Sequence, residues 1–477
     1  MLSSRAVMSR ARTIVIVVVG AWLVAGCSIW PMLRGGPART GDNRNETNID
    51  AGNVARLHKT WTDVTDVANP NVSSPVVAAD TSYVVSSNTL YAFHAFGQTD
   101  CSGTPKTCAP LWTAPTGGSF ESAVSVSAYI ALVATGNTVN LTNAKLDAFD
   151  AHGQTGCGGT PKTCAPLWTS TISCAAGATA CLLSSPVIAN GVAYVGVNSN
   201  ATCCTASVLA FDAHGVTGCS GNPKICQPIR TYDIQCQAGF SCEPTPAAVA
   251  GGVMYVATNT NEQDFGNSGN LLAFDAAGTV NCSGVPVTCE PLWTASTLGV
   301  RSSPAVANGM VYVTGSSLPD PQQFSSSGTV AAYDAAGTRH CSGTPKICTP
   351  LWSVNDLGPI FSPAAVARGN IYVNVFSGDL HVLNAINGTP RWTDLTGHHG
   401  DGAPTVANNV TYVTDAGKLD AFDADGTTSC SGSPKTCTPL LTVASGTQSS
   451  SGHEAAIANG TVFTGGSNAL RAFRLHG

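Results

Sequence analysis

Charged side chains are scarce in this chain of 477 residues. Asp, Glu, Lys and Arg make up only 10% of it, and the formal net charge is −6. Beyond the N-terminus there is no basic run. This excludes nucleic-acid binding, which relies on clustered Lys and Arg to neutralise phosphates. The shortage of charged helix formers also excludes a coiled coil. Apolar residues amount to 43%, enough for a core, which excludes a disordered chain.

Familiar catalytic signatures are missing as well. The sequence contains no CxxCH haem attachment signal, no GxSxG, no HExxH and no Walker A motif. What the chain has in abundance is 50 Gly, 27 Pro and 19 Cys. This composition favours many tight turns and, in an oxidising compartment, disulfide bonds.

The first 26 residues have the pattern of a secretory signal peptide. Residues 1–12 carry three Arg and no acid, and Thr13–Gly26 is an apolar run too short to span a hydrocarbon core of about 30 Å. The following Leu-Val-Ala-Gly-Cys sequence resembles the lipobox of bacterial lipoproteins, in which Cys27 becomes the lipidated first residue. We predict that residues 1–26 are removed and that the lipid on Cys27 anchors the exported protein to the outer side of the bacterial cell membrane. An ordinary secretory signal with a chance Cys is the alternative.

A repeated module runs through the rest of the chain. Its first half, SSPxxANGxxYV in the fullest form, recurs eight times, and a second half, LxAFDAxG followed by PLWT, accompanies it. Asn-Gly between apolar β-branched runs is a strong hairpin signal, so each module predicts a four-stranded antiparallel meander of about 56 residues. Packed radially, such sheets bury both their faces. The sequence predicts an all-β fold: an eight-bladed β-propeller over residues 55–477, preceded by an N-terminal segment, residues 27–54.

The two ends of the repeat array complement each other. The last module stops at 469–477, before a fourth strand, whereas ARLHKTWT at 55–62 is a fourth strand without a module. We therefore predict that residues 55–62 close the last blade, pairing with the strand around 469–475. A closed ring leaves few free sheet edges.

The AFDAxxG…W pattern resembles the tryptophan-docking repeat of the pyrroloquinoline-quinone-like (quinoprotein alcohol dehydrogenase-like) β-propellers. Matching tryptophans occur at Trp61, Trp112, Trp168, Trp293, Trp352 and Trp392. The stretch WPMLRGGPARTGDNRNETNI at 30–49 resembles the start of quinoprotein dehydrogenases. The resemblance implies tryptophans stacked between adjacent blades. It does not fix the function, because the family includes alcohol dehydrogenases, an outer-membrane assembly lipoprotein and many binding proteins.

Twelve cysteines form six copies of C-x6-C between the third and fourth strands. Gly and Pro in each copy allow a tight reversal that brings the two sulfurs together, so we predict six local disulfides. Zinc is a poor alternative, because its cysteine pairs are usually closer in sequence. The predicted pairs are Cys101/Cys108, Cys157/Cys164, Cys219/Cys226, Cys282/Cys289, Cys341/Cys348 and Cys430/Cys437.

Six further cysteines leave their pairing open. Cys236 and Cys242 lie in one loop, whereas Cys174, Cys181, Cys203 and Cys204 belong to one blade and allow three pairings. A direct Cys203–Cys204 ring resembles the vicinal disulfide that covers the quinone in some quinoprotein alcohol dehydrogenases, although there the pair precedes a first strand. Cross-linking to Cys174 and Cys181 is the plainer interpretation, because these residues share a blade.

Candidate ligand-binding residues gather in the loops predicted at one mouth of the central channel. HHGD supplies His398, His399 and Asp401, and GHE supplies His453 and Glu454. Imidazoles with carboxylates suit a divalent cation or general-base chemistry, and solvated loop side chains are the alternative. Asn137, in a Thr-Gly-Asn stretch, resembles the calcium-ligating Asn of quinoprotein dehydrogenases. A plain turn explains it equally simply.

The leading prediction is an exported, lipid-anchored propeller that acts as a non-catalytic binding or scaffold protein at the cell envelope. Its expected contacts are the membrane, through Cys27, and an envelope protein, peptide or glycan. We expect a monomer without cofactor. The alternative is a calcium- and pyrroloquinoline-quinone-dependent alcohol or sugar dehydrogenase, in which Asn137, Cys203 and Cys204 would contact the quinone and its calcium.

Overall fold

The computed structural model describes most of the chain after the predicted signal peptide. The described residues are 28–63, 72–118, 120–136, 143–173, 181–199, 205–236, 242–260, 268–300, 302–317, 327–394, 397, 402–415, 417–445, 453–466 and 469–475. Within these ranges the structure is β-sheet apart from one short 3-10 helix, η1 (Val54–Arg56). No helix in the described part is long and apolar enough to cross a membrane.

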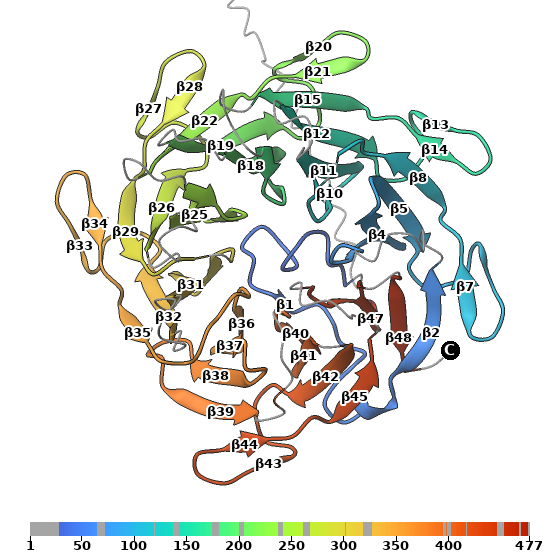
Figure 1. Ribbon diagram of the computed structural model, residues 1–477, viewed down its shortest axis with the longest axis vertical. Helices are drawn as coiled ribbons and strands as arrows, with labels where there is room; N and C mark the ends of the chain where they lie inside the picture. Colours follow the sequence, from blue (N-terminus) through green and yellow to red (C-terminus); the bar gives the residue numbers. More distant parts are fainter. Residues whose placement is uncertain are drawn as a thin grey trace, which may run out of the picture.

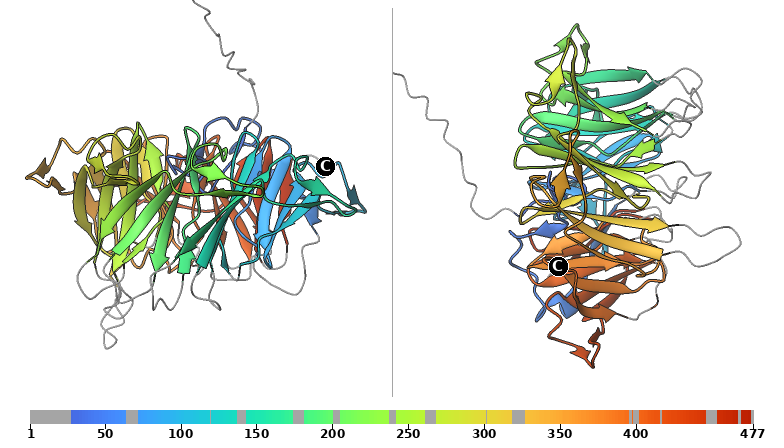
Figure 2. Two further views of the ribbon diagram at one scale, coloured as in Figure 1. Left: turned by 90° about the horizontal axis from the view of Figure 1, so that it is seen from above. Right: turned by 90° about the vertical axis from the view of Figure 1, so that its left-hand side faces the viewer.

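Strand pairing groups the described strands into eight sheets, which stand around a common axis like the blades of a propeller (Figure 1). Each sheet contains an antiparallel meander of four strands that runs from the axis to the rim, and each blade is named here by its innermost and outermost strands. Seen from the side, the ring is a thick disc (Figure 2). The meanders are β3 (Val76–Ala78), β4 (Thr81–Ser86), β5 (Thr89–His94), β8 (Trp112–Pro115); β10 (Ser125–Ser127), β11 (Ile130–Gly136), β12 (Asn143–Asp150), β15 (Trp168–Ser173); β17 (Val187–Ala189), β18 (Val192–Ser199), β19 (Thr205–Asp212), β22 (Arg230–Gln235); β24 (Ala248–Ala250), β25 (Val253–Thr260), β26 (Gly269–Asp275), β29 (Trp293–Thr297); β30 (Ala305–Ala307), β31 (Met310–Ser317), β32 (Ser327–Asp334), β35 (Trp352–Val354); β36 (Ala365–Ala367), β37 (Asn370–Asn374), β38 (Leu380–Asn384), β39 (Pro390–Asp394); β40 (Thr405–Ala407), β41 (Val410–Asp415), β42 (Lys418–Asp423), β45 (Leu441–Ala444); and β46 (Ala456–Ala458), β47 (Thr461–Thr464), β48 (Arg471–Arg474), β2 (His58–Asp63).

The predicted fold class needs correction in the make-up of the blades. We predicted four-stranded, purely antiparallel blades, but among the described sheets only the β30–β35 sheet has four strands, and the others have five to seven. The additions are β1 (Asp42–Asn43), β9 (Phe120–Glu121), β16 (Cys181–Leu183), β23 (Cys242–Pro244) and the strands of six hairpins. Most of the extra strands lie at blade edges, where an unpaired strand would otherwise expose its N–H and C=O groups.

The six C-x6-C segments form those hairpins, and all six predicted disulfides are confirmed. Each hairpin projects from the rim and pairs in parallel with the outermost strand of the preceding blade, as β7 does with β2 (Figure 1). It therefore straps two blades together, which the spacing of the cysteines did not predict. The hairpins are β6 (Cys101–Ser102) with β7 (Lys106–Cys108), β13 (Cys157–Gly158) with β14 (Thr163–Cys164), β20 (Cys219–Ser220) with β21 (Lys224–Cys226), β27 (Cys282–Ser283) with β28 (Val287–Cys289), β33 (Cys341–Ser342) with β34 (Ile347–Cys348), and β43 (Cys430–Ser431) with β44 (Thr436–Cys437).

Tryptophan docking joins neighbouring blades, as the family resemblance implies. The indole N–H of Trp61 donates to the Ala95 carbonyl (3.2 Å), and that of Trp168 donates to the Ala213 carbonyl (3.1 Å), in each case in the next blade. The ring lies over the glycine of the AFDAxG turn. A Cβ on Gly97 would lie 2.6 Å from the Trp61 ring, and the φ of Gly97 is 59°, so glycine is required there.

The predicted closure of the ring is confirmed. β2 pairs antiparallel with β48 and so supplies the outermost strand of the β46–β2 blade. The side chain of Asp63 accepts a hydrogen bond from the Leu470 N–H (2.8 Å). The apolar core lies between adjacent blades, and one cluster joins Trp61 and Phe93 to Phe463 across the closure.

Candidate functional site

The start of the described chain, residues 28–43, crosses the centre of the ring and is called here the axial segment (Figure 1). The innermost strands expose backbone N–H groups to the axis, and carbonyls of the axial segment accept hydrogen bonds from them. The pairs, at 2.7–2.9 Å, are Val77 with Trp30, Val126 with Pro31, Val249 with Pro37, Val306 with Ala38, Val366 with Thr40 and Val406 with Gly41. The segment thus contacts most blades around the ring in turn.

Arg34 and Glu454 form a buried ion pair at the axis. Arg34 Nη1 lies 3.0 Å from Glu454 Oε2, and the two side chains are 0% and 1% exposed. Glu454 Oε1 accepts two more hydrogen bonds, from the Arg34 backbone N–H (2.5 Å) and from Trp30 Nε1 (3.3 Å). Burial lowers the pKa of Arg34, against the opposing effect of Glu454. The carboxylate is therefore used to hold the axial segment in place.

Both axial arginines also bind backbone carbonyls from several blades. Arg34 donates to the carbonyls of Pro404 and Ala364, each at 2.8 Å. Arg39 donates to the carbonyls of Ala247 (2.6 Å) and Pro186 (3.1 Å), and burial lowers its pKa to about 10. The four carbonyls belong to four different blades, which the two arginines thus connect at the axis. Charge-assisted hydrogen bonds of this kind are stronger than neutral ones.

Of the two His-carboxylate clusters predicted from the sequence, the structure describes only the GHE pair. His453 is half-buried, desolvation lowers the pKa of its imidazole, and its backbone carbonyl accepts a hydrogen bond from the Thr414 hydroxyl. Glu454 belongs to the ion pair with Arg34, so the two residues do not form an open cation site.

The other predicted site residues fall outside the described ranges. They are Cys27, Asn137, Cys174, Cys203, Cys204, His398, His399 and Asp401. Of the six cysteines whose pairing the sequence left open, Cys236 is disulfide-bonded. The lipidation of Cys27 and the quinone and metal contacts of the others therefore stay predictions.

The described residues at the axis do not fit a quinone with calcium. Such a pair needs a carboxylate free to bind the cation, and both oxygens of Glu454 are already bonded to Arg34 and Trp30. Within the described ranges no group of three or more His, Cys, Asp or Glu side chains is placed to hold a metal. We derive no redox step from this arrangement.

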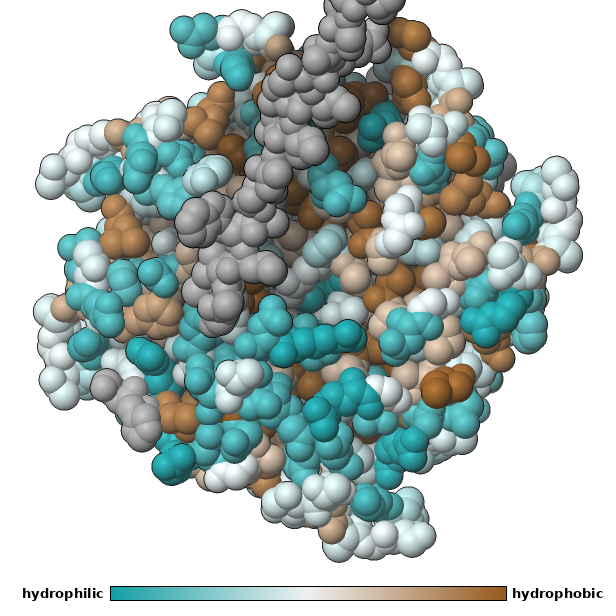
Figure 3. All heavy atoms as spheres, turned by 180° about the vertical axis from the view of Figure 1, so that it is seen from behind, coloured by the Kyte–Doolittle hydropathy of each residue, from teal (hydrophilic) through white to brown (hydrophobic). Residues whose placement is uncertain are grey.

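A polar cleft of about 450 Å³ lies where β1 leaves the axis. It is lined by charged and amide side chains, including Asp42, Arg44, Arg368 and Asn408. Arg44 Nε donates to Asp42 Oδ2 at 2.9 Å, and Arg368 binds the Asp425 carboxylate with two hydrogen bonds. Figure 3 shows hydrophilic residues gathered below the centre of the face that it draws. The cleft suits a polar ligand or a polar partner surface.

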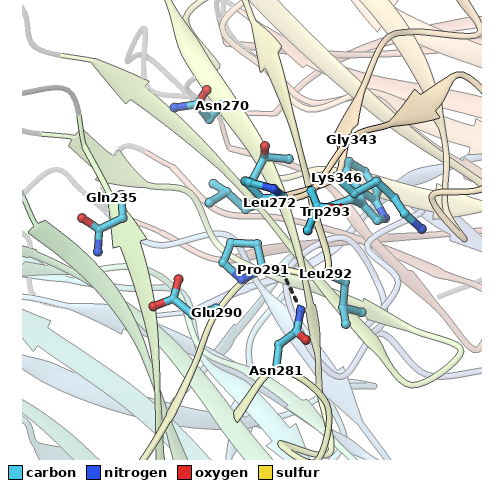
Figure 4. Close-up of a pocket in the computed structure, with 13 residues that line it drawn as sticks. Gln235, Asn270, Leu272, Asn281, Glu290, Pro291, Leu292, Trp293, Gly343 and Lys346 are labelled. Atoms are coloured by element: carbon cyan, nitrogen blue, oxygen red, sulfur yellow. Dashed lines mark hydrogen bonds between the residues drawn. The ribbon is translucent and has the colours of Figure 1, made fainter. Parts of the chain in front are cut away.

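A larger cleft, of about 710 Å³, lies at the rim between two hairpins (Figure 4). Its floor is Leu272, Leu292 and Trp293, and the β33–β34 turn forms one wall. Glu290 and Lys346 lie at opposite sides of it in Figure 4. An apolar floor with opposite charges at its sides suits a ligand that has an apolar part and charged groups. The sequence did not predict this cleft, because it depends on two hairpins of neighbouring blades.

Comparison with known proteins agrees with this architecture. Residues 326–476 match a protein-family model described as outer membrane protein assembly factor BamB. The fold is that of a β-propeller, and residues 326–476 resemble the PQQ-like repeat family. A quinohemoprotein alcohol dehydrogenase from Pseudomonas putida HK5 superposes with a TM-score of 0.59 at 12% identity, over 94% of this chain and 80% of that one.

Two other solved structures superpose on this chain. BamB from Moraxella catarrhalis has a TM-score of 0.54 at 12% identity, with 88% of this chain and 99% of that chain covered. The computationally designed Ika8 protein has a TM-score of 0.56 at 12% identity, with 87% and 99% covered. Among curated protein sequences no match was found. At such low identity the likeness concerns the fold.

Proposed function

We propose that this PQQ-like propeller is an exported, lipid-anchored protein that acts as a non-catalytic binding or scaffold protein of the cell envelope. The observation that carries the proposal is the occupied centre of the ring. Residues 28–43 are bonded there to the innermost strands of most blades, and Arg34 is bonded to Glu454. The match of residues 326–476 to the BamB family model supports an assembly or scaffold role.

The surfaces left for binding are the two clefts and the rim. The rim cleft beside Trp293 is apolar with charged sides, and the cleft at Asp42 is polar. Both are open surface features rather than enclosed chambers. This favours a protein, peptide or glycan as ligand over a buried cofactor.

The anchor is tested by metabolic labelling with a clickable palmitate analogue in a bacterial host. We expect the wild-type protein to be labelled and to sediment with membranes, and Cys27→Ser to lose the label. Unlabelled wild-type protein would contradict the lipid anchor.

The non-catalytic role is tested against the dehydrogenase that shares this fold. The purified protein is incubated with pyrroloquinoline quinone and Ca²⁺, and dye reduction is followed with primary alcohols and aldoses. We expect the rate of the quinone–Ca²⁺ blank. Saturable, alcohol-dependent dye reduction would overturn the proposal in favour of a quinoprotein dehydrogenase.

A further inference from the structure

The outermost strands of the blades differ in what covers their free edges. Six of them pair with a disulfide-closed hairpin from the next blade: β2, β8, β15, β22, β29 and β39. In the described part of the chain β35 and β45 have no such partner, and each is the last strand of its sheet. Figure 1 shows the hairpins projecting from the rim, and in the described sheets none of them pairs with β35 or β45.

The gap at β45 is covered by another part of the chain. Ile49, Val54 and Leu57 pack in one apolar cluster with Leu441 and Val443 of β45. The N-terminal segment therefore shields this edge. No described segment does the same for β35.

The exposed edge at β35 carries an incompletely covered tryptophan. Trp352 is partly exposed, whereas the five other docking tryptophans are at least 98% buried. Trp352 Nε1 has no hydrogen-bond partner among the described residues. In the next blade a short turn replaces the hairpin, and Ile386 on that turn is 72% exposed. The site thus combines an open strand edge with apolar side chains.

The covered edges show what kind of segment fits such a strand. At three of them the N–H of the residue after the docking tryptophan donates to the carbonyl of a hairpin lysine at 3.0 Å: Thr113 to Lys162, Thr294 to Lys346 and Thr393 to Lys435. In three hairpins the lysine ammonium donates to the carbonyl of the docking glycine, as Lys106 does to Gly97 at 3.0 Å. At β35 the corresponding donor is the Ser353 N–H, and the corresponding glycine is Gly388, which packs on Trp352.

We propose that β35 is a docking edge for an extended segment of a partner protein. The segment adds to β35 in parallel, accepts a hydrogen bond from the Ser353 N–H, and places a lysine over Trp352 with its ammonium at the Gly388 carbonyl. This is strand addition to an open edge, with a side-chain requirement taken from the covered edges of the same ring. The inference rests on the proposed scaffold function and names the partner's chemistry.

The test uses a synthetic hairpin peptide as a probe. The peptide has the sequence of residues 340–349, closed by its disulfide, with a photoreactive diazirine side chain at the position of Ile347. It is irradiated with the purified full chain, and the labelled fragment is identified by mass spectrometry. We expect saturable labelling of the fragment that contains Trp352 and Ser353, and labelling weaker by about tenfold or more when the peptide's lysine is replaced by glutamate.

Two variants should prevent the peptide from binding to β35. Ser353→Pro removes the N–H, and Ser353→Ala, its matched control, keeps it. In a second variant, residues 425–438, with the β43–β44 hairpin, replace residues 386–389, so the chain covers β35 itself. We expect Ser353→Ala to be labelled like wild type and the labelling of the other two to fall by about tenfold or more. If Ser353→Pro does not fold, the graft alone decides.

Several results would overturn the proposal. They are no labelling at millimolar peptide, labelling outside β35, or equal labelling of the graft variant. A wild-type dimer in analytical ultracentrifugation that the graft converts to a monomer would assign the edge to a second copy instead of a partner protein. The labelling does not depend on lipid at Cys27 or on dye reduction, so its failure is distinct from a failure of the proposed function.

Discussion

Two junctions between neighbouring blades are built in different ways. Between the β24–β29 and β30–β35 blades, Trp293 lies over Gly337, the Tyr255 hydroxyl donates to the Ala335 carbonyl (3.0 Å), and β34 pairs with β29. Between the β40–β45 and β46–β2 blades, Leu441 replaces the tryptophan and no hairpin is present in the described residues.

At that second junction, the N-terminal segment supplies the missing contacts. The Tyr412 hydroxyl has no described hydrogen-bond partner, and burial raises its pKa well above its usual range. Glu46 accepts a hydrogen bond from the Gly460 N–H (2.9 Å), and Asn408 donates to the Ile49 carbonyl (3.0 Å). In this repeat protein, one junction between blades is therefore packed by a local motif, and the other by a segment from the opposite end of the chain.

The largest expected effect comes from removing that distant segment. Deleting residues 28–62 removes the axial segment and most of β2, which exposes the edge of β48 and the site that Trp61 occupies. We expect aggregation or loss of the cooperative melting transition, measured by calorimetry and light scattering. As a control, replacing residues 336–349 by Ile-Asn-Gly-Thr removes only one hairpin and should leave a folded monomer. An unchanged Tm and monomer state after the deletion would refute the role of the segment.

Breaking the axial ion pair should have the next largest effect. Arg34→Met leaves Glu454 buried without its cation, which should lower the free energy of unfolding by about 3–5 kcal/mol. Urea unfolding measures this. The double variant Arg34→Met/Glu454→Gln should lose less free energy of unfolding than the two single variants lose together. Arg44→Met should lower the free energy of unfolding by less than about 1 kcal/mol, because the Arg44 side chain is 69% exposed in its pair with Asp42. Equal costs for Arg34 and Arg44 would contradict the assignment.

The docked junction is tested at its glycine. A Cβ on Gly337 would clash with the Trp293 ring, and its φ is 61°. Gly337→Ala should lower the free energy of unfolding by about 3 kcal/mol, because it strains the backbone and displaces the Trp293 indole. Gly309→Ala is the matched control, because its φ is 73° and a Cβ there meets nothing within 4 Å. Gly309→Ala should lower the free energy of unfolding by about 1 kcal/mol, because backbone strain is its only effect. Thermal melts of both variants decide.

A hairpin disulfide should matter less than the docked tryptophan. The loop closed by Cys341 and Cys348 is short, so in the chain-entropy model the bond stabilises by about 2–3 kcal/mol. We expect the double variant Cys341→Ser/Cys348→Ser to fold with a correspondingly lower Tm. Thiol titration of the native wild-type protein should find none of the twelve hairpin cysteines reactive, and twelve reactive thiols would contradict the disulfides.

The smallest effect concerns the aspartate of the AFDA-type turn. Burial alone would raise the pKa of Asp334, but hydrogen bonds from the N–H groups of Arg339 and Thr338 outweigh it and lower the pKa. The carboxylate therefore stabilises the fold fully above about pH 4, and less as the pH falls through the lowered pKa. Asp334→Asn should lower the free energy of unfolding by about 1.5 kcal/mol at pH 7 and by less at about pH 3. Urea unfolding at both pH values measures this difference. The same cost at both values would contradict this.

Much of the propeller could be predicted from local sequence. The Asn-Gly turns, the AFDAxG turns and the tryptophans each act within one module or between two adjacent ones, so their spacing carries the information. The unmatched strand at 55–62 predicted the closure by simple complementarity. The six hairpin disulfides were also predictable, because Gly and Pro between two closely spaced Cys allow the chain to reverse and bring the sulfurs together.

The rest depends on contacts that sequence spacing does not encode. Arg34 and Glu454 are 420 residues apart, and the GHE motif gave no sign that its carboxylate faces an arginine from the other end of the chain. The blades were wrongly predicted as simple four-stranded sheets, because nothing in a hairpin's own sequence says that it pairs with the preceding blade. Asn137, Cys203, Cys204, His398, His399 and Asp401 stay predictions.

The closure between β2 and β48 sets an order of events for biosynthesis. β2 precedes its antiparallel partner, β48 (Arg471–Arg474), by all the other blades of the ring. β2 therefore waits without this partner until β48 has been synthesised. If the chain is exported through a secretion channel, the ring closes only on the far side, where the hairpin cysteines can also be oxidised. A truncated product lacking β48 keeps the earlier blades but cannot close the ring, so one edge of β2 is left open to pairing with other chains.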